Sequence, residues 1–277
     1  AMLGSATAFI ESSLAVIYRK KEKDGYYTGG TPFIIEKRLN MRWLGIIYAL
    51  ASVVCYFGVT QVMSNSITGS ITSVYIWGAN NKFFNLQNIS SIAVAILVAY
   101  IIFFSKSKKD SIIESLNKIV PFMAIIYVVA VIYILVTNLT NIPAMIGTIF
   151  SQAFGTNEVL GGTFGAVVMN GVRRGLFSNE AGSGNSNYAA AAVHIDIPAK
   201  QGMVQAFGVF IDTLVICSAT AFIVLLAPKS TISGLSGMAL FQAAMSHHLD
   251  GFGALFVVIL MFFFCISPIL AVAFYGR

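Results

Sequence analysis

The chain has 277 residues, of which 57% are hydrophobic and only 10% are Asp, Glu, Lys or Arg. A soluble protein of this size cannot bury so much apolar surface and still cover itself with solvated side chains, so a soluble fold is excluded. The formal net charge of +6 does not indicate a nucleic-acid partner, because the basic residues fall in short connections and not on one amphipathic face. The composition predicts an integral membrane protein surrounded by the lipid bilayer.

Seven membrane-crossing segments are predicted along the chain. In chain order they are 1–18, 43–70, 88–105, 117–138, an interrupted segment at 159–193, 201–227 and 251–276. Most of them approach or exceed the roughly 20 residues that a helix needs to cross about 30 Å of hydrocarbon. No low-complexity linker separates them, so we expect an all-α fold with a single polytopic domain over 1–277. Because the chain starts and stops in hydrophobic runs, we interpret it as a piece of a longer protein.

Basic residues mark alternate connections between these segments. The connections rich in Lys and Arg are 19–42, 105–118, 194–201 and the chain end at Arg277. The connections with few or no Lys and Arg are 71–87, 138–157 and 228–250. The positive-inside rule places the basic connections in the cytoplasm and the poor ones outside. We therefore expect a multi-pass protein of the cell membrane, that is, an inner or plasma membrane. The connection 19–42 also contains an amphipathic stretch at 33–39.

A stripe of small and polar residues follows the predicted crossing 43–70. Its members recur at three- and four-residue steps and are Gly58, Gln61, Asn65, Thr68, Gly69 and Thr72. One interpretation is that the stripe only lets helices approach closely. Gln61 and Asn65 favour a functional interpretation, because a side-chain amide brings both donors and acceptors to the middle of the bilayer. We predict that these two residues contribute to a binding site.

Asp212 lies inside the predicted crossing 201–227. A carboxylate near the middle of a crossing costs roughly 2.5–3.5 kcal/mol on insertion scales unless it is paired, protonated or hydrogen-bonded. Asp212 is therefore either a staple to a hydroxyl or cation on a neighbouring helix or a ligand in a cation site. The residues alone leave both interpretations open.

The interrupted segment 159–193 is too long for one plain crossing. Nine of the thirteen residues 175–187 are Gly, Ser or Asn, which favour turns over helix. This predicts a helix broken inside the membrane, where irregular backbone is tolerated only if it lines a cavity or is buried in protein. The ends of a broken helix can meet a carboxylate and a sodium ion. A re-entrant or plain cytoplasmic loop is the alternative.

Other chemistry is weakly indicated. The three cysteines Cys55, Cys217 and Cys265 lie in apolar runs without the spacing of a metal site, so we expect them to pack in the core. No nucleophile–base or metal constellation and no phosphate-binding motif is present, so we predict neither an enzyme nor a cofactor. A repeated filter ring, which a channel would need, is also missing from the sequence.

Several motifs of the chain resemble those of the alanine or glycine:cation symporter family, the sodium:alanine symporters. The longest is Gly-Val-Arg-Arg-Gly-Leu-Phe-Ser-Asn-Glu-Ala-Gly at 171–182, continued by alanines at 189–192. Further matches are Lys-Gln-Gly at 200–202, Gln-Ala-Phe-Gly-Val-Phe-Ile-Asp-Thr at 205–213, and the opening Gly-Ser-Ala-Thr at 4–7 with Glu11 and Arg19. Together the motifs cover most of the chain.

The resemblance implies a leucine-transporter-like bundle of two inverted five-helix repeats, in which the present segments are roughly the second to the eighth helix. It also implies coupled uptake of a small neutral amino acid with sodium as the coupling ion. Carried over by motif, Gly175, Phe177, Ser178 and Asn179 would lie near the substrate. Asp212, Thr213 and Ser267 would serve sodium.

The chain departs from the family pattern at several positions. The usual Gly-Gly-Pro-Met-Tyr-Tyr reads Gly-Gly-Thr-Pro-Phe-Ile at 29–34, which puts Thr31 in the place of a proline. In the crossing 43–70 only Asn65 and Ser66 keep the family's register, and Gln61 is displaced from it. The alternatives to a symporter are a channel, another membrane protein with a polar site in mid-membrane, or an inert truncated fragment.

Overall fold

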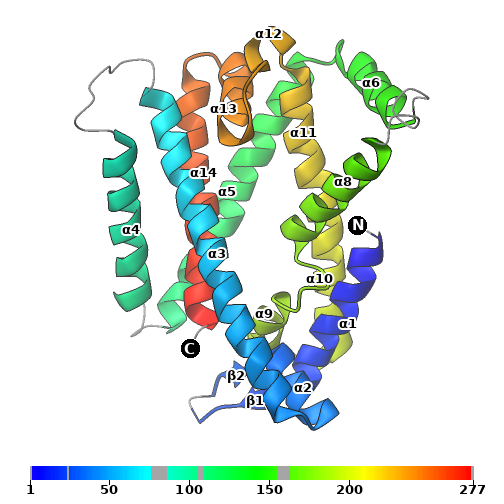
Figure 1. Ribbon diagram of the computed structural model, residues 1–277, viewed down its shortest axis with the longest axis vertical. Coiled ribbons are helices and arrows are strands. Elements are labelled where there is room, and N and C mark those ends of the chain that lie inside the picture. Colours follow the sequence, from blue (N-terminus) through cyan, green and yellow to red (C-terminus); the bar gives the residue numbers. More distant parts are fainter. Residues whose placement is uncertain (1, 24, 76–85, 105–108, 155–162, 276–277) are drawn as a thin grey trace. The chain divides into compact units, whose positions relative to one another are not determined.

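The computed structural model describes residues 2–23, 25–75, 86–104, 109–154 and 163–275, and these are almost entirely helical (Figure 1). In chain order the elements are α1 (Met2–Tyr18), β1 (Lys20–Lys21), β2 (Tyr27–Thr28), α2 (Thr31–Leu39), α3 (Arg42–Tyr75), α4 (Leu86–Phe104), α5 (Lys109–Thr137), α6 (Ile142–Phe154), α8 (Thr163–Asn179), α9 (Ser186–Ala192), α10 (Pro198–Ile211), the π-helical turn η2 (Asp212–Ile216), α11 (Cys217–Leu226), α12 (Lys229–Ile232), α13 (Gly237–His248) and α14 (Phe252–Tyr275). The predicted all-α class is confirmed, with one two-residue antiparallel ladder between β1 and β2.

Four of the described helices are long and apolar enough to cross a membrane. They are Arg42–Val74, Leu116–Thr137, Pro198–Leu226 and Phe252–Ala273, and Met2–Tyr18 and Ile89–Tyr100 are shorter apolar helices. The bounds agree with the predicted crossings to within a few residues, because long apolar runs in a bilayer must satisfy their backbone by forming helices. The chain is a multi-pass membrane protein.

Three predicted connections contain short helices. The connection 19–42 holds α2, the connection 138–157 holds α6, and the connection 228–250 holds α12 and α13. These helices are too short to span the bilayer, so they do not appear as long apolar runs in the sequence. Most of the predicted connection 105–118 is helical, because α5 begins at Lys109, and residues 105–108 lie outside the described residues. Residues 76–85 of the connection 71–87 and Arg277 also lie outside them.

The chain forms two compact units. The first comprises Ala1–Cys55 and Gly147–Ala219, and the second comprises Tyr56–Ile146 and Thr220–Arg277. The chain passes from one unit to the other within α3, within α6 and within α11. The broken segment and the polar residues around Asp212 belong to the first unit.

In the first unit, α1 packs along α10 and along α9 through small residues (Figure 1). Ala15 of α1 is fully buried against Ala190 and Ala191 of α9. Gly202 of α10 faces α1 so closely that a Cβ there would lie 2.7 Å from the carbonyl oxygen of Phe9. Without a hydrophobic effect between helices in lipid, such close backbone approach supplies the packing energy.

In the second unit, α5 and α4 pack against α14. A buried apolar cluster joins α3, α4 and α14 and consists of Ile67, Val94, Val98, Cys265, Ile266 and Ile269. The short helix α13 is fastened by Gln242, whose Nε2 donates to the carbonyl oxygens of Ser70 and Ala254 at 3.2 and 3.1 Å. Cys265 is thus a core residue, as predicted, and Cys217 is half-buried. The prediction is wrong for Cys55, which is exposed on α3, because an apolar run in a membrane helix can face lipid as well as the core.

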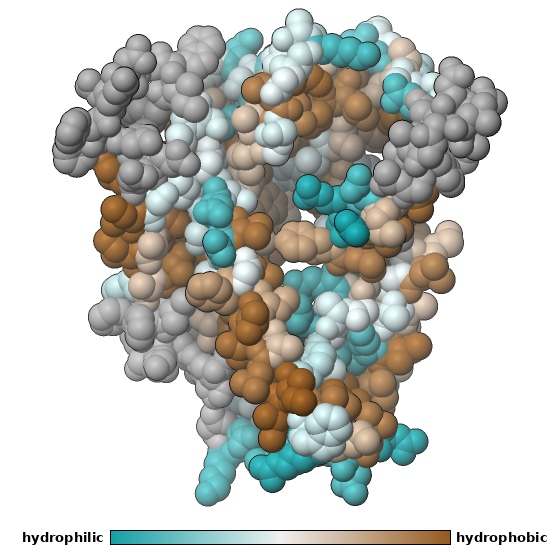
Figure 2. All heavy atoms as spheres, viewed as in Figure 1, coloured by the Kyte–Doolittle hydropathy of each residue, from teal (hydrophilic) through white to brown (hydrophobic). Residues whose placement is uncertain are grey.

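The surface of the chain matches a membrane setting. Val53, Val54 and Phe57 of α3 are 67, 73 and 75% exposed, which is typical of a helix face in contact with lipid. Hydrophilic side chains gather at the lower end in Figure 2, where Figure 1 places β1, β2 and α2. This end carries the basic connection 19–42.

Candidate functional site

The broken segment is a pair of helices, α8 and α9, joined by residues 180–185. At the end of α8, the side-chain oxygen Oδ1 of Asn179 accepts the backbone N–H of Ala181 at 3.0 Å, which turns the chain out of the helix. Glu180, Gly182 and Gly184 then have φ angles of 52, 85 and 76°, in the left-handed region. Two of these three positions are glycine, the residue that adopts this conformation without steric cost.

The break is narrower than the sequence predicts. The composition places it over 175–187, but α8 continues through Gly175, Phe177 and Ser178 to Asn179. The apolar residues between these positions keep the helical pattern going, and the helix ends only where the glycines cluster. A Cβ on Gly175 would meet no atom within 4 Å, and Phe177 is 56% exposed.

The last two residues of α8 hydrogen-bond to the first two residues of the π-helical turn. The hydroxyl of Ser178 donates to Oδ2 of Asp212 at 2.7 Å, and Nδ2 of Asn179 donates to Oγ1 of Thr213 at 3.1 Å. The structure therefore brings together two predicted substrate residues and two predicted sodium residues. One interpretation of Asp212 is that it hydrogen-bonds to a hydroxyl on a neighbouring helix. The structure contains this bond, since the hydroxyl belongs to Ser178 of α8.

A π-helical turn at Asp212–Ile216 displaces the side chains of this helix from regular α-helical spacing. The N–H of Asp212 is shared between the carbonyl oxygens of Gly208 and Val209, and the N–H of Cys217 reaches back to the carbonyl oxygen of Asp212. Such turns are rare, and they occur frequently at functional sites. The wider turn is the local reason why Asp212 and Thr213 both reach α8.

The arrangement favours a cation. The C-terminal end of α8, a helix of 17 residues, carries the negative end of a helix dipole, and the carboxylate of Asp212 lies beside it. In the described part of the chain the ion pairs involve Lys20, Arg42 and Lys118, and none of them reaches Asp212. Carboxylate and hydroxyl oxygens at a helix C-terminus are ligands that suit sodium.

Three predicted site residues belong to the second unit. Gln61 and Asn65 are exposed residues of α3, and Ser267 is a buried residue of α14. The hydroxyl of Ser267 donates to the carbonyl oxygen of Phe264 at 3.4 Å. In a regular helix that carbonyl would accept the N–H of residue 268, but Pro268 has no N–H. The Ser267 hydroxyl replaces this missing donor. The roles of Gln61, Asn65 and Ser267 in a site with α8 stay predictions.

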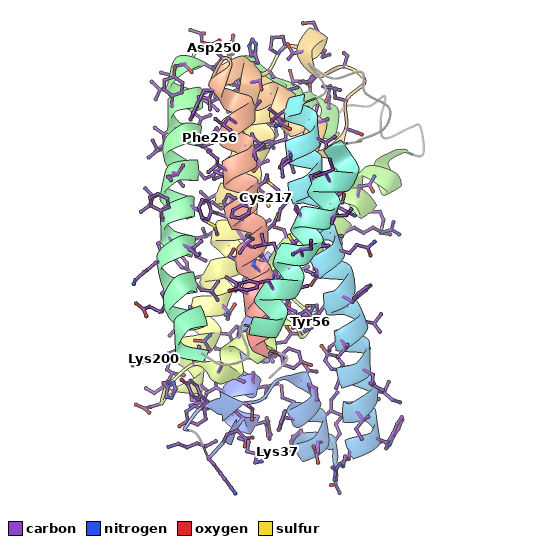
Figure 3. The ribbon with its side chains drawn as sticks, turned by 90° about the vertical axis from the view of Figure 1, so that its left-hand side faces the viewer. Lys37, Tyr56, Lys200, Cys217, Asp250 and Phe256 are labelled. Atoms are coloured by element: carbon purple, nitrogen blue, oxygen red, sulfur yellow. The ribbon has the colours of Figure 1, made fainter. Side chains whose placement is uncertain are left out.

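Sequence reasoning missed two residues near the break as site residues. Glu11 of α1 accepts the backbone N–H of Gly182 at 3.3 Å through Oε2, and it therefore holds the turn between the two half-helices. The cost of a carboxylate inside an apolar helix, which drew attention to Asp212, applies equally to Glu11. Cys217 lies 3.4 Å from the hydroxyl of Ser178 through Sγ, and Figure 3 shows it partway along the helix that begins near Lys200.

The sequence matches the family described as the sodium:alanine symporter family over residues 1–277. It is 38% identical to the amino-acid carrier protein AlsT of Bacillus subtilis, over 100% of the chain and 57% of that relative. It is also 38% identical to the probable sodium/glutamine symporter GlnT of the same organism, over 100% of the chain and 56% of that relative. Identity to the sodium/alanine symporter AgcS of Methanococcus maripaludis is 34%, over 100% of the chain and 60% of the relative. The chain thus spans little more than half the length of these relatives.

Proposed function

Because the chain belongs to the sodium:alanine symporter family, a family of transporters and not of enzymes, we propose that it forms much of a sodium-coupled carrier for a small neutral amino acid. Alanine and glycine are the proposed substrates, and alternating access is the proposed mode of transport. The proposed architecture is a leucine-transporter-like bundle in which the chain supplies roughly the second to the eighth helix.

One observation carries the proposal: the hydrogen bonds that join the end of α8 to the π-helical turn. Ser178 and Asn179 contact Asp212 and Thr213 at 2.7 and 3.1 Å. The proposed substrate residues are thus hydrogen-bonded directly to the proposed sodium residues. A contact of this kind supports coupling, because one ligand can change how the site binds the other.

The coupling step follows from the single proton of the Ser178 hydroxyl. Without a cation, that proton is held by the carboxylate of Asp212. A sodium ion coordinated by Asp212 and Thr213 would occupy the carboxylate lone pairs that accept the proton of Ser178. The Ser178 hydroxyl would then be free to donate that proton in a hydrogen bond to a substrate carboxylate. Gly175, Phe177 and Asn179 would complete the substrate side from α8. Gln61 and Asn65 would add to it from α3, and Ser267 would serve a second sodium ion.

The choice of substrate rests on the names of the relatives. Two of these names refer to alanine carriers or symporters, and a third refers to glutamine. We propose alanine, or the still smaller glycine, over glutamine because more of these names refer to alanine.

The test is uptake of radiolabelled alanine by proteoliposomes that contain the purified full-length protein. An inward sodium gradient should drive accumulation, and glycine should compete better than glutamine. Replacing external sodium by potassium should abolish the accumulation. Alanine uptake that is indifferent to the sodium gradient would contradict the coupling, and flux that does not saturate with alanine would indicate a channel.

A further inference from the structure

Hydroxyl groups from the basic connection and from α3 cap the exposed backbone of the break. The hydroxyl of Tyr48 donates to the carbonyl oxygen of Ser183 at 2.7 Å, and the hydroxyl of Thr31 donates to the carbonyl oxygen of Gly184 at 3.0 Å. These carbonyls lie outside both half-helices and have no helical partner. The two hydroxyls therefore satisfy backbone acceptors that the helices leave without a partner.

Thr31 uses its hydroxyl group twice. Its proton goes to Gly184, so the same oxygen can only accept from its second neighbour, Asn187, whose Nδ2 lies 2.9 Å away. This fixes the amide of Asn187, which is 2% exposed, with its NH₂ group toward Thr31. One side chain of α2 thereby joins the last part of the break to the first turn of α9.

The fit around Gly184 is close. A Cβ at this position would lie 2.6 Å from Oγ1 of Thr31 and closer still to the hydroxyl of Tyr48. Thr31 is the first residue of α2, whose N-cap is Gly30, and both hydrogen bonds of its hydroxyl go to the broken segment. The hydroxyl is directed entirely at the broken segment.

We propose that Thr31 is a positioning residue of the transport site. Its two hydrogen bonds set the distance between the connection 19–42 and the break. Because the break follows directly on α8, they also orient the end of α8 that carries Ser178 and Asn179. Thr31 replaces the proline of the usual family motif, and a proline side chain can form neither hydrogen bond. The effect of Thr31 on uptake rests on the proposed function, but its effect on the break does not.

The experiment compares four versions of the full-length protein: wild type, Thr31→Val, Thr31→Ser and Thr28→Val. Valine keeps the shape of threonine without the hydroxyl, and serine keeps the hydroxyl. Thr28 is the matched control, because its hydroxyl lies on the same connection but donates to the carboxylate of Glu22 at 2.9 Å and not to a carbonyl of the break. Each version is measured by hydrogen–deuterium exchange of the peptide covering 181–188 and by alanine uptake kinetics at equal amounts of inserted protein.

Thr31→Val should exchange the amides of 181–188 about tenfold faster, the effect expected when one or two hydrogen bonds are lost. It should also raise the KM for alanine several-fold, with a smaller change in maximal rate. Thr31→Ser and Thr28→Val should behave as wild type in both measurements.

Unchanged exchange in Thr31→Val would overturn the proposal. So would faster exchange with an unchanged KM, because the break would then be loosened without consequence for the site. If the wild type takes up no amino acid, the proposed function fails, and the exchange of 181–188 still decides whether Thr31 positions the break.

Discussion

The hydroxyl of Ser178 has one proton, and Asp212 holds it in the structure. A hydrogen bond to a carboxylate is stronger than one between neutral groups, so the pair resists separation unless another positive charge takes the place of the proton. The proposed coupling through this pair requires no movement over a long distance. It requires only that sodium and the serine proton compete for the same oxygen.

Replacing Ser178 by alanine should therefore weaken the dependence of substrate affinity on sodium. We expect Ser178→Ala to raise the KM for alanine about tenfold, the loss of one hydrogen bond to a charged group, and to make that KM nearly independent of sodium. Uptake at several sodium concentrations measures both effects. Ser151→Ala is the control, because the hydroxyl of Ser151 only returns to a carbonyl of its own helix. A KM that keeps its full sodium dependence in Ser178→Ala would contradict the role.

The glycines of the break allow a second prediction. Gly182 and Gly184 both have left-handed φ angles, but an added Cβ meets no atom within 4 Å at Gly182 and is crowded at Gly184. Each substitution by alanine should lose about 1–2 kcal/mol from backbone strain, and Gly184→Ala should lose more because Tyr48 and Thr31 must move. The melting temperature in detergent is the measurement. Equal melting temperatures for the two variants would show that the contacts around Gly184 are loose.

Single site residues could be predicted from the sequence where a polar side chain costs much free energy to place inside an apolar helix. Asp212 stood out because a carboxylate is expensive inside an apolar helix, and the same argument should have selected Glu11. The hydrogen bonds of Ser178 and Thr213 could not be predicted, because they depend on a π-helical turn that moves the helix face, and no residue pattern marks such a turn.

Among the helices, α1 and α10 are joined by small side chains. Gly202 lies where α10 meets Phe9 and Ser13 of α1, whereas Gly208 of the same helix has open space around it. We expect Gly202→Ala to lower the melting temperature by several degrees, because the two backbones must separate, and Gly208→Ala to leave it almost unchanged. If both variants melt together with the wild type, α1 and α10 do not pack as described.

The helix α13 is joined to α11 by a histidine that responds to pH. The ring Nε2 of His248 lies 2.9 Å from the carbonyl oxygen of Ile223. Burial lowers the pKa of His248 below its usual 6.5, a hydrogen bond to Ile223 raises it in part, and the neighbouring His247 lowers it further. The unfolded chain therefore binds a proton at a higher pH than the folded chain does.

The contribution of His248 to the free energy of unfolding is fully present above about pH 6.5. It is lost as the pH falls from there toward the lower pKa that His248 has in the folded state. The melting temperature of the wild type should fall between pH 7 and pH 5 by more than that of His248→Gln, which cannot titrate. His194→Gln, in the other unit, controls for the loss of a histidine as such. The same pH dependence in the wild type and in His248→Gln would refute this assignment.

The long helices were predictable because hydrocarbon imposes one simple demand, an unbroken run of apolar residues long enough to span it. The helices α6 and α13 were not, since neither is long enough to span the bilayer. The break was found by composition, but its edges were set by three left-handed residues and by the side chain of Asn179.

For the whole chain, charge and apolar length predict a multi-pass membrane protein. The division into two compact units was not predictable, because it depends on which distant helices pack together. The family resemblance includes residues at the end of α8 and in the helix that follows the break. Four of them hydrogen-bond in pairs in the structure: Ser178 with Asp212, and Asn179 with Thr213.

The most direct test of the central claim is the sodium dependence of alanine uptake in Asp212→Asn, measured in proteoliposomes beside the wild type and Asp196→Asn. Asp196 is an exposed carboxylate in the connection before α10, so its replacement controls for the loss of one charge. We predict that Asp212→Asn raises the sodium concentration for half-maximal uptake tenfold or more, as expected for the loss of a charged ligand worth roughly 1.5–3 kcal/mol, and that Asp196→Asn leaves it unchanged. The same sodium dependence in Asp212→Asn and in the wild type would mean that Asp212 only staples two helices, and the proposed coupling would be wrong.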